Sequence, residues 1–299
     1  MTDDTTPFAL TAGLTDLRLA GDGLEFAVYR ATSPRHSLPD NPDIALRIPK
    51  ATIFSNVNDP HLDAKHLLQQ ELTIYAFVKP SAVPVPEPYE LLEVNGKYAM
   101  MSEYIESDGS TPSPHTLGRG LAQLHLVQLP AGFTTVACEG MDVLTVLPRR
   151  ITHRLAELRK YDSELPDTLS EDMLKSAVAD LKRSPWSLLR MDWRPANLRT
   201  KAGEIVGVVD FSNALVGPAA VDIFRVLELL DPGPEFLAGY AALKSLTHVS
   251  RAEELCLRLD AAVMLALVFI SEVPDEQLAA RWTLRVRELY RRLQDELLS

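Results

Sequence analysis

Three polar residues that can bind a metal ion, Asp192, Asn197 and Asp210, stand near the ends of apolar runs in LLRMDWRPANLRTKAGEIVGVVDFSNA, residues 188–214. Asp192 follows one run, Asp210 ends the next, and Lys201–Gly203 supplies a turn between them. A strand, a turn and a returning strand would bring the two carboxylates together. Carboxylate and amide oxygens are ligands that Mg²⁺ prefers when it also binds phosphate. The segment therefore predicts that these three side chains share one divalent cation and handle a phosphate group.

A plainer interpretation of the same residues stays open at this point. Asp and Asn often stabilise turns, because their side chains bond to nearby backbone groups. Asp192 and Asn197 could each cap a turn, and Asp210 could cap a following helix. The metal hypothesis depends on the three residues acting as one pattern.

The N-terminal third carries the signals of a small antiparallel sheet with one helix. Strand-like runs at 24–31 and 43–50 are followed by a helical pattern over 61–79. Two further runs, YELLEV and KYAMMSEYI, are joined by Asn95 and Gly96. Asn-Gly between apolar runs is the strongest short hairpin signal.

Past Ile105 the sequence changes from strand-like to helical. Residues 106–114 are polar and rich in turn formers, and Ser113 before Pro114 is typical of a helix start. Helical patterns occupy roughly 141–183 and most of 220–299. The order of elements predicts an α+β protein with a small sheet-rich lobe and a larger helical lobe.

Composition excludes several classes of function. The chain has 299 residues, is 46% hydrophobic and carries a formal net charge of −11. That charge argues against a nucleic-acid partner, because phosphate backbones are bound by clustered Lys and Arg. With no signal-peptide layout and no long apolar run, we expect a cytoplasmic protein without a membrane partner. Cys138 and Cys256 lack metal-site spacing, so we expect both to be buried or incidental.

DWRPAN followed by GVVDFSNA resembles the aminoglycoside phosphotransferase and choline kinase-like family, which is related to protein kinases. The resemblance implies a two-lobed kinase-like fold, with a nucleotide-binding lobe over 1–105 and a catalytic and substrate-binding helical lobe over 106–299. It also implies ATP and Mg²⁺ as cofactors. Asp192 falls on the family's catalytic Asp, and Asn197 and Asp210 fall on its metal-binding residues.

The resemblance extends to the N-terminal lobe. IALR (44–47) is similar to the strand whose last residue reaches the ATP phosphates, which makes Arg47 the phosphate-contacting candidate. Glu71 falls where the family has a helix Glu that pairs with that basic residue. Arg suits bidentate contact with phosphate oxygens. The alternative for Glu71 is a solvated charge on a helix face.

Two further parts of a nucleotide site follow from the resemblance. The stretch from Glu103 to Ile105 is similar to the connection whose backbone bonds to adenine. Gly21 and Gly23, in AGDGLEF, stand at the first hairpin, where the family has its glycine loop. Two glycines are a thin version of that loop.

The departures from the family pattern bear on the catalytic loop. Arg190 and Met191 stand where the family usually has His and Gly, and Arg194 replaces a second His. Arg194 adds a cation beside the metal site, where it would contact the transferred phosphate or a carboxylated substrate. Its alternative is a surface Arg stacked on Trp193. Asp222 resembles the family's Asp that braces the catalytic loop.

His125, in LGRGLAQLHL, resembles a residue of the first long helix of the large lobe, and we expect it to be packed in the core.

The resulting hypothesis is transfer of the γ-phosphate of ATP to a hydroxyl of a small molecule such as an antibiotic, an amino alcohol or a sugar. Two alternatives stay open. One is a kinase-like nucleotide-binding module without turnover, which Arg190, Met191 and the thin glycine loop would favour. The other is a different ATP chemistry on the same fold, such as ligation or elimination, which Arg194 would favour. The sequence does not identify the acceptor or the oligomeric state.

Overall fold

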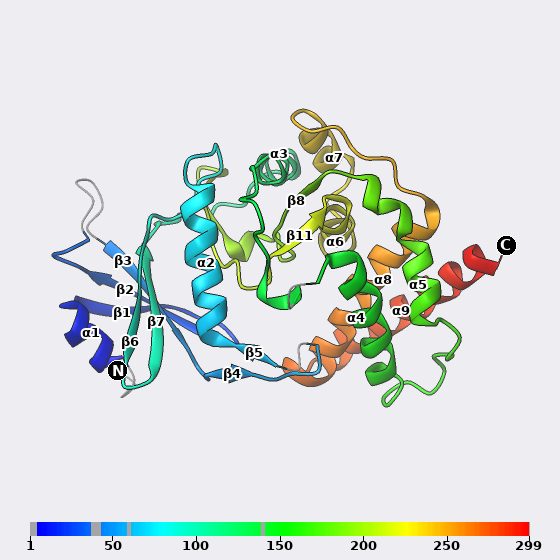
Figure 1. Ribbon diagram of the computed structural model, residues 1–299, viewed down its shortest axis with the longest axis horizontal. Helices are drawn as coiled ribbons and strands as arrows, with labels where there is room; N and C mark the ends of the chain where they lie inside the picture. The colour runs from blue at the N-terminus through cyan, green and yellow to red at the C-terminus, as the bar shows by residue number, and fades with distance from the viewer. Residues whose placement is uncertain (1–4, 37–42, 59–60, 139–140, 299) are drawn as a thin grey trace. The chain divides into compact units, whose positions relative to one another are not determined.

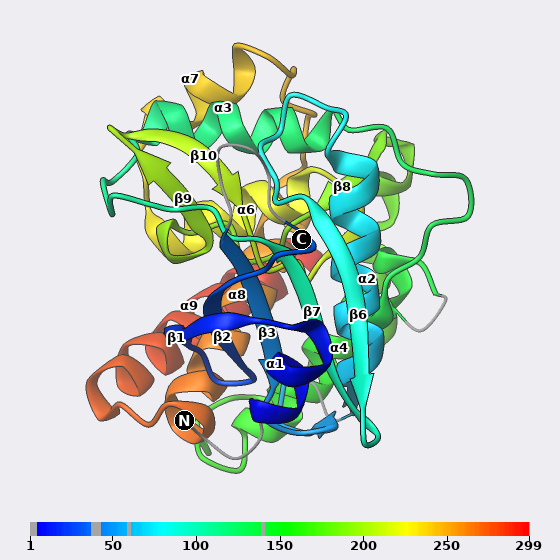
Figure 2. The same ribbon diagram turned by 90° about the vertical axis from the view of Figure 1, so that its left-hand side faces the viewer.

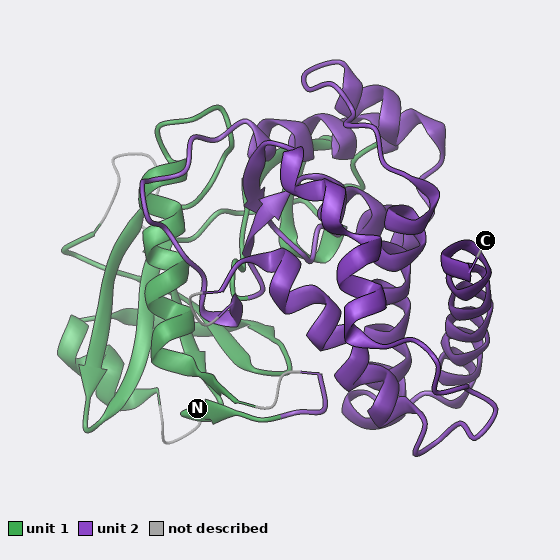
Figure 3. Ribbon diagram, turned by 45° about the vertical axis from the view of Figure 1, so that its right-hand side comes forward, with its two compact units in different colours: residues 1–55, 61–113, 195–212 green, residues 56–60, 114–194, 213–299 purple. Residues whose placement is uncertain are grey.

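The computed structural model describes residues 5–36, 43–58, 61–138 and 141–298. The chain forms two compact units, each built from several stretches (Figure 3). Unit 1 comprises residues 1–55, 61–113 and 195–212, and unit 2 comprises residues 56–60, 114–194 and 213–299. Asp210 and Asn197 thus belong to the same unit as the N-terminal sheet.

Unit 1 contains a five-stranded antiparallel sheet in the described residues, with strand order β1-β2-β3-β7-β6 (Figure 2). Its strands are β1 (Thr15–Asp22), β2 (Phe26–Thr32), β3 (Asp43–Pro49), β6 (Pro88–Val94) and β7 (Lys97–Glu103). A second, two-stranded pairing joins β4 (Ile53–Phe54) to β5 (Leu62–Asp63).

The two faces of the sheet are covered by different helices, α1 (Thr6–Ala12) and α2 (Ala64–Val78) (Figure 1). On β3, Ile44, Leu46 and Ile48 are buried in one cluster with Phe8 of α1. Successive side chains of a strand point to opposite faces. Arg47 therefore points to the other face, toward α2.

The hairpin predicted at Asn95 and Gly96 is confirmed. The two residues join β6 to β7 with φ values of 53° and 73°. Positive φ at both central positions is the type I′ turn that matches the twist of an antiparallel pair. The hairpin fixes the register of β7, which ends at Glu103.

The third stretch of unit 1 is a 3-10 turn (Pro195–Asn197) followed by the hairpin β9 (Leu198–Lys201) and β10 (Glu204–Val208). The polar connection after β7 is hydrogen-bonded to this hairpin. Asp108 accepts a hydrogen bond from the Ala202 N–H at 2.7 Å, and Ser110 Oγ accepts one from the Gly203 N–H at 2.8 Å. A hydrogen bond from the Ser110 side chain, together with those from the Ala202 and Ser110 N–H groups, lowers the pKa of the exposed Asp108 carboxyl to about 2.

Unit 2 is mainly helical. Its helices are α3 (Pro114–His125), α4 (Val143–Leu158), α5 (Glu171–Ala177), α6 (Ala220–Leu230), α7 (Pro234–Ala241), α8 (Arg251–Leu267) and α9 (Glu276–Leu298), with short 3-10 turns at Val136–Cys138 and Ala179–Arg183 and a π-helical turn at Val268–Glu272. Strand β8 (Trp186–Leu189) precedes the loop that carries Asp192 and pairs antiparallel with β11 (Leu215–Pro218). The core of this unit lies among α4, α8 and α9.

The predicted α+β fold, with an antiparallel N-terminal sheet and a helical C-terminal part, is confirmed. Pro114 begins α3 as the sequence indicated. Cys138 and Cys256 are both buried and free.

In the described ranges, none of the helices combines the length and the apolar character that a membrane span requires.

Candidate active site

Arg47 places a buried positive charge between two carboxylates of unit 1. Its Nη1 atom lies 3.2 Å from Glu71 Oε2, and its Nη2 atom lies 2.6 Å from Asp210 Oδ1. The guanidinium carbon is 4.1 Å from the ring centroid of Phe26. Burial lowers the pKa of Arg47, but the charges of Asp210 and Glu71 outweigh burial and leave this pKa raised. Arg47 is therefore a permanent cation.

One donor of this guanidinium is unused in the described structure. Arg47 Nε is buried and has no hydrogen-bond partner among the described residues. Buried polar atoms are nearly always paired, and an exception calls for an explanation. A cation with a spare N–H fits an anionic ligand such as a phosphate group.

Glu71 is a buried member of this cluster. Its side chain is 1% exposed, and its Oε1 atom accepts hydrogen bonds from the Tyr75 hydroxyl and, at 2.9 Å, from the Asp210 N–H. The alternative that Glu71 is a solvated charge on a helix face is wrong. Burial and the adjacent Glu71 charge raise the pKa of Tyr75, so its hydroxyl stays protonated and acts as a donor.

Helix α2 is also bonded to the chain that follows Asp210. Gln70 Nε2 donates to the Phe211 carbonyl at 2.9 Å and to the Ser212 carbonyl at 3.2 Å. Asp210 itself has a φ of 65°, in the left-handed region, and its Oδ1 atom accepts a bond from Ser212 Oγ at 2.7 Å. The turn at Asp210 is therefore held from both sides, which fixes the carboxylate next to Arg47.

Asn197 lies beside the end of β10. The Val209 N–H donates to the Asn197 carbonyl at 3.1 Å, and Asn197 is 8% exposed. The hairpin between Asn197 and Asp210 thus returns the chain, as the sequence predicted. One carboxylate and one carboxamide are a donor set that fits Mg²⁺, which usually keeps waters and takes further oxygens from a substrate phosphate.

Asp192 and Arg194 belong to unit 2, where they form an ion pair. Arg194 Nε lies 2.9 Å from Asp192 Oδ1 and 3.1 Å from Oδ2, and the two side chains are 50% and 21% exposed. Trp193 between them is buried and donates from Nε1 to the Leu117 carbonyl at 3.1 Å. Since Asn197 and Asp210 belong to unit 1, a cation shared by all three residues stays a prediction.

The loop before Asp192 is held by Asp222 of α6. The Asp222 carboxylate accepts hydrogen bonds from the Arg190 N–H at 2.5 Å and from the Met191 N–H at 2.7 Å. His125 is 2% exposed, and its Nε2 atom lies 3.2 Å from Asp222 Oδ2. The expected bracing role of Asp222 and the packed position of His125 are both confirmed.

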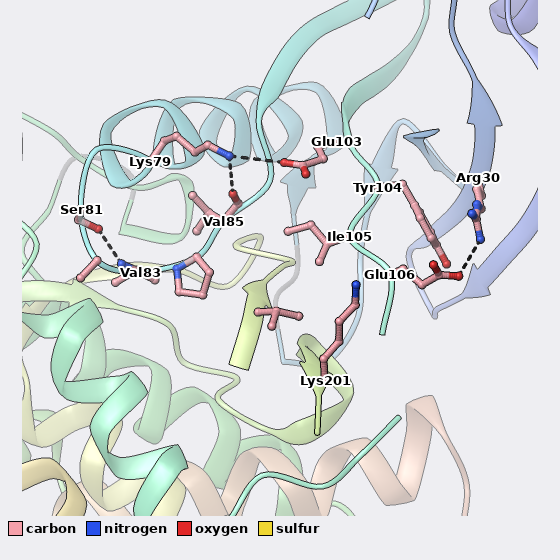
Figure 4. Close-up of a pocket in the computed structure, with 13 residues that line it drawn as sticks. Arg30, Lys79, Ser81, Val83, Val85, Glu103, Tyr104, Ile105, Glu106 and Lys201 are labelled. Carbon is pink, nitrogen blue, oxygen red and sulfur yellow. Dashed lines mark hydrogen bonds and ion pairs between the residues drawn. The ribbon is translucent and has the colours of Figure 1, made fainter. Parts of the chain in front are cut away.

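Glu103 and Ile105 line a pocket of about 530 Å³ that lies entirely within unit 1 (Figure 4). The pocket is bounded by the α2–β6 loop, the chain after β7, and Lys201 and Val206 of the β9–β10 hairpin. Lys79 Nζ lies 3.4 Å from Glu103 Oε2, and Arg30 Nη1 lies 3.2 Å from Glu106 Oε1. Arg47, Glu71 and Asp210 do not line this pocket. The sequence-predicted cofactor residues are therefore divided between a pocket and a separate charged cluster.

Gly21 and Gly23 lie at the β1–β2 hairpin. Gly21 pairs with Val28, and the Gly23 N–H donates to the Phe26 carbonyl at 2.9 Å. Both glycines are placed as the sequence indicated, next to the strand whose Phe26 ring covers Arg47.

Sequence reasoning missed three residues of the charged cluster: Tyr75, Gln70 and Ser212. Tyr75 occupies a position in the apolar pattern of the helix, so the sequence did not indicate a hydrogen-bonding role for its hydroxyl. Gln70 precedes Glu71 on α2, and its bonds are to backbone carbonyls more than a hundred positions away in the chain. Contacts of this kind leave no local pattern.

The sequence matches the phosphotransferase enzyme family over residues 16–255, and the chain belongs to that family. No curated protein matches the sequence.

Solved structures of similar fold include a gentamicin complex of APH(2″)-IIa, with a TM-score of 0.63, 13% identity and coverage of 97% of this chain and 98% of that one. APH(4)-Ia in a ternary complex with AMP-PNP and hygromycin B gives a TM-score of 0.62 at 14% identity, covering 98% and 99%. Macrolide 2′-phosphotransferase type I gives 0.57 at 18% identity, covering 96% and 97%. The resemblance to the aminoglycoside phosphotransferase family is confirmed.

Proposed function

We propose that the protein is an ATP-dependent small-molecule kinase that moves the γ-phosphate to a hydroxyl group. The arrangement of Arg47 between Glu71 and Asp210 carries this proposal. It joins a cation that can bind phosphate to a carboxylate that can bind a metal ion, inside one unit. Phosphoryl transfer asks a protein mainly for positioning and charge neutralisation, and these are the properties of such a cluster.

Asn197 and Asp210 are the residues that would hold Mg²⁺. Bound there, the ion would neutralise charge on the β- and γ-phosphate oxygens. Arg47 would add positive charge from β3, and Glu71 would keep its guanidinium oriented. Tyr75 would keep Glu71 oriented in turn, through the bond from its hydroxyl.

Asp192 is the proposed base. Its carboxylate would accept a hydrogen bond from the acceptor hydroxyl and take the proton as the new O–P bond forms and the β–γ bridging bond breaks. A positioned base of this kind contributes about 10²–10⁴-fold. Arg194, bonded to both oxygens of Asp192, would orient the carboxylate and contact the transferred phosphate.

We assign nucleotide binding to residues 1–105 and catalysis with acceptor binding to residues 106–299. The backbone from Glu103 to Ile105 would contact the base, and the hairpin with Gly21 and Gly23 would approach the phosphates. The support for ATP comes from Arg47 and from similar structures that were solved with ATP or AMP-PNP. Other similar structures contain GDP, so the choice of nucleotide is part of the test.

The acceptor is proposed only as a class, a small molecule with a hydroxyl group. The similar structures include complexes with gentamicin, streptomycin and hygromycin B, and a macrolide phosphotransferase. Aminoglycosides are cationic and macrolides are largely apolar, so these two groups define opposite ends of the acceptor range.

The deciding experiment incubates the protein with Mg-ATP or Mg-GTP and a panel of aminoglycosides, macrolides, amino alcohols, sugars and hydroxy acids. Nucleoside diphosphate release and product mass are followed together. We expect one acceptor to gain the mass of one phosphate. Loss of water or a coupled product would instead show elimination or ligation. Thermal stabilisation by nucleotide with no product from any acceptor would show a binding module without turnover.

A further inference from the structure

Met191, the residue before Asp192, has an unusual backbone conformation. Its φ is 61°, in the left-handed region that L-residues with a side chain rarely adopt. Its side chain is 3% exposed and belongs to the core of unit 2. A conformation of this kind persists only where the surrounding contacts enforce it. The contacts around Met191 therefore decide where the next residue points.

Both backbone polar groups of Met191 are held by α6. The N–H donates to Asp222 Oδ1 at 2.7 Å, and the carbonyl accepts a hydrogen bond from Arg225 Nε. Asp222 and Arg225 lie three positions apart, so they share one face of the helix. The helix thus bonds to the peptide groups on both sides of Met191, to the N–H through the Asp222 carboxylate and to the carbonyl through the Arg225 guanidinium.

Arg225 is itself fixed from behind. Its Nη1 atom lies 3.2 Å from Asp260 Oδ2 on α8, and Asp260 Oδ1 lies 2.9 Å from Arg154 Nη1 on α4. Asp260 is 2% exposed and Arg154 is fully buried. Burial raises the pKa of Asp260, but the charges of Arg154, Arg150 and Arg225 outweigh burial and leave this pKa lowered, so the carboxylate is ionised. The chain of contacts from α4 through α8 to α6 therefore ends on the Met191 carbonyl.

We propose that Arg225, fixed by Asp260 and Arg154, is a positioning residue that locks Met191 in its left-handed conformation and so sets the direction of the Asp192 side chain. The consequence for turnover rests on the proposed function, in which Asp192 is the base. The mechanical part, the locking of the loop, does not depend on it.

The chain offers a matched control for the test. Arg258 of α8 bonds to Glu228 of α6 at 3.0 Å, so it also joins α8 to α6 through an Arg–carboxylate pair. In the described part of the chain, its hydrogen bonds are to Glu228 and Glu254 and not to residues 190–194. Arg225→Met and Arg258→Met each remove one such pair while keeping a long side chain. Only the first change removes the bond to the Met191 carbonyl.

The test measures hydrogen exchange by mass spectrometry in the full-length protein, at a temperature where every variant is folded. In Arg225→Met, we expect amide exchange in peptides covering 188–194 to rise at least tenfold. Arg258→Met should leave it within twofold of wild type. Turnover, measured in parallel, should fall at least tenfold in kcat for Arg225→Met, with the KM for ATP changed less than twofold.

Arg225→Lys covers the case in which Arg225→Met does not fold. A lysine keeps the charge beside Asp260 but has one nitrogen in place of the three of a guanidinium. It should therefore give an intermediate rise in amide exchange and an intermediate loss of kcat. The proposal is overturned if the folded Arg225 variant shows the same amide hydrogen exchange over residues 188–194 as Arg258→Met. A wild-type protein without turnover on any acceptor would contradict the proposed function, and the exchange data alone would then decide whether Arg225 locks the loop.

Discussion

Arg47 Nη2 lies 2.6 Å from Asp210 Oδ1, so the cation of β3 and the acid after β10 form a direct ion pair inside unit 1. The pair joins residues that are 163 positions apart in the chain. It also leaves Asp210 bonded to Ser212 and held by Glu71 through its N–H. A bound phosphate would compete with Asp210 for Arg47, and a cation would compete with Arg47 for Asp210. Nucleotide and metal are therefore expected to bind together better than either binds alone.

Arg47→Met tests this cluster. The change leaves the Glu71 and Asp210 carboxylates without their shared cation, and removal of one partner of a buried pair typically costs about 3–5 kcal/mol. We expect the free energy of unfolding to fall by that order and the affinity for Mg-ATP to fall at least tenfold, measured by denaturation and calorimetry. Arg47→Lys should keep most of the stability but lose nucleotide affinity, because a lysine lacks the bidentate fork.

Arg18→Met is the control for a lost positive charge. Arg18 lies on β1 of the same sheet and is exposed. The variant should bind nucleotide like wild type. If Arg18→Met and Arg47→Met lose affinity equally, general electrostatics explains binding and the cluster does not.

Asp192→Asn separates chemistry from nucleotide binding. The amide keeps the size of the side chain but no longer accepts a proton at neutral pH, so kcat should fall by about 10²-fold or more. The dissociation constant for Mg-ATP should stay within about twofold, because the proposed role of Asp192 is toward the acceptor. Asp210→Asn should weaken Mg-ATP binding as well as turnover. Normal turnover in Asp192→Asn would refute its assignment as the base.

Much of the site was predictable because its signals are local. Asp192 and Asp210 each end an apolar run, with Asn197 between them. Arg47 was instead predicted from the resemblance to the family, and its place on the face of β3 opposite Ile44 and Ile48 agrees with strand alternation. The Asn95–Gly96 turn likewise needed only two adjacent residues. These features follow from spacing, since the period of a strand and the chemistry of a turn are written in consecutive residues.

The rest depended on contacts between distant segments. The left-handed conformation of Met191 is enforced by α6, at a position where the family usually has Gly and this chain has a large side chain. Strand β11 contains Gly217 and Pro218, residues that disfavour strands, yet it pairs with β8. In both places tertiary bonding overrides local preference, so the sequence alone gives no pattern to read.

Acid should weaken unit 2 through Glu228. Burial raises the pKa of this carboxyl, but bonds from Arg285 and Arg258 outweigh burial and lower it below the ordinary value of 4.5. A lowered folded-state pKa stabilises the fold above the ordinary value, and that stabilisation is lost as the pH falls through the folded pKa. Glu228→Gln should therefore cost about 2 kcal/mol at pH 7 and progressively less below pH 4.5. Denaturant unfolding at both pH values checks this, and a cost that stays constant with pH would contradict it.

Gly118→Ala should destabilise unit 2 through the contact of α3 with α7. A Cβ atom at Gly118 would lie 2.0 Å from the Phe236 carbonyl oxygen, and one at Gly239 would lie 2.1 Å from the His115 carbonyl oxygen. The obstacle is backbone in both cases, so the two helices must move apart. Overpacking of this kind costs about 1–3 kcal/mol or more.

Gly21→Ala is the matched control for Gly118→Ala. Its φ lies outside the left-handed region, and a Cβ there would meet only Val28 Cβ, at an ordinary 3.9 Å. We expect denaturant unfolding of Gly21→Ala to stay within about 0.5 kcal/mol of wild type, the usual range for a surface substitution. The same variant also tests the proposed glycine hairpin, because nucleotide affinity should fall if the phosphates approach the Gly21 backbone closely. Equal stability of Gly118→Ala and Gly21→Ala would show that α3 and α7 tolerate a wider spacing than their backbone contact implies.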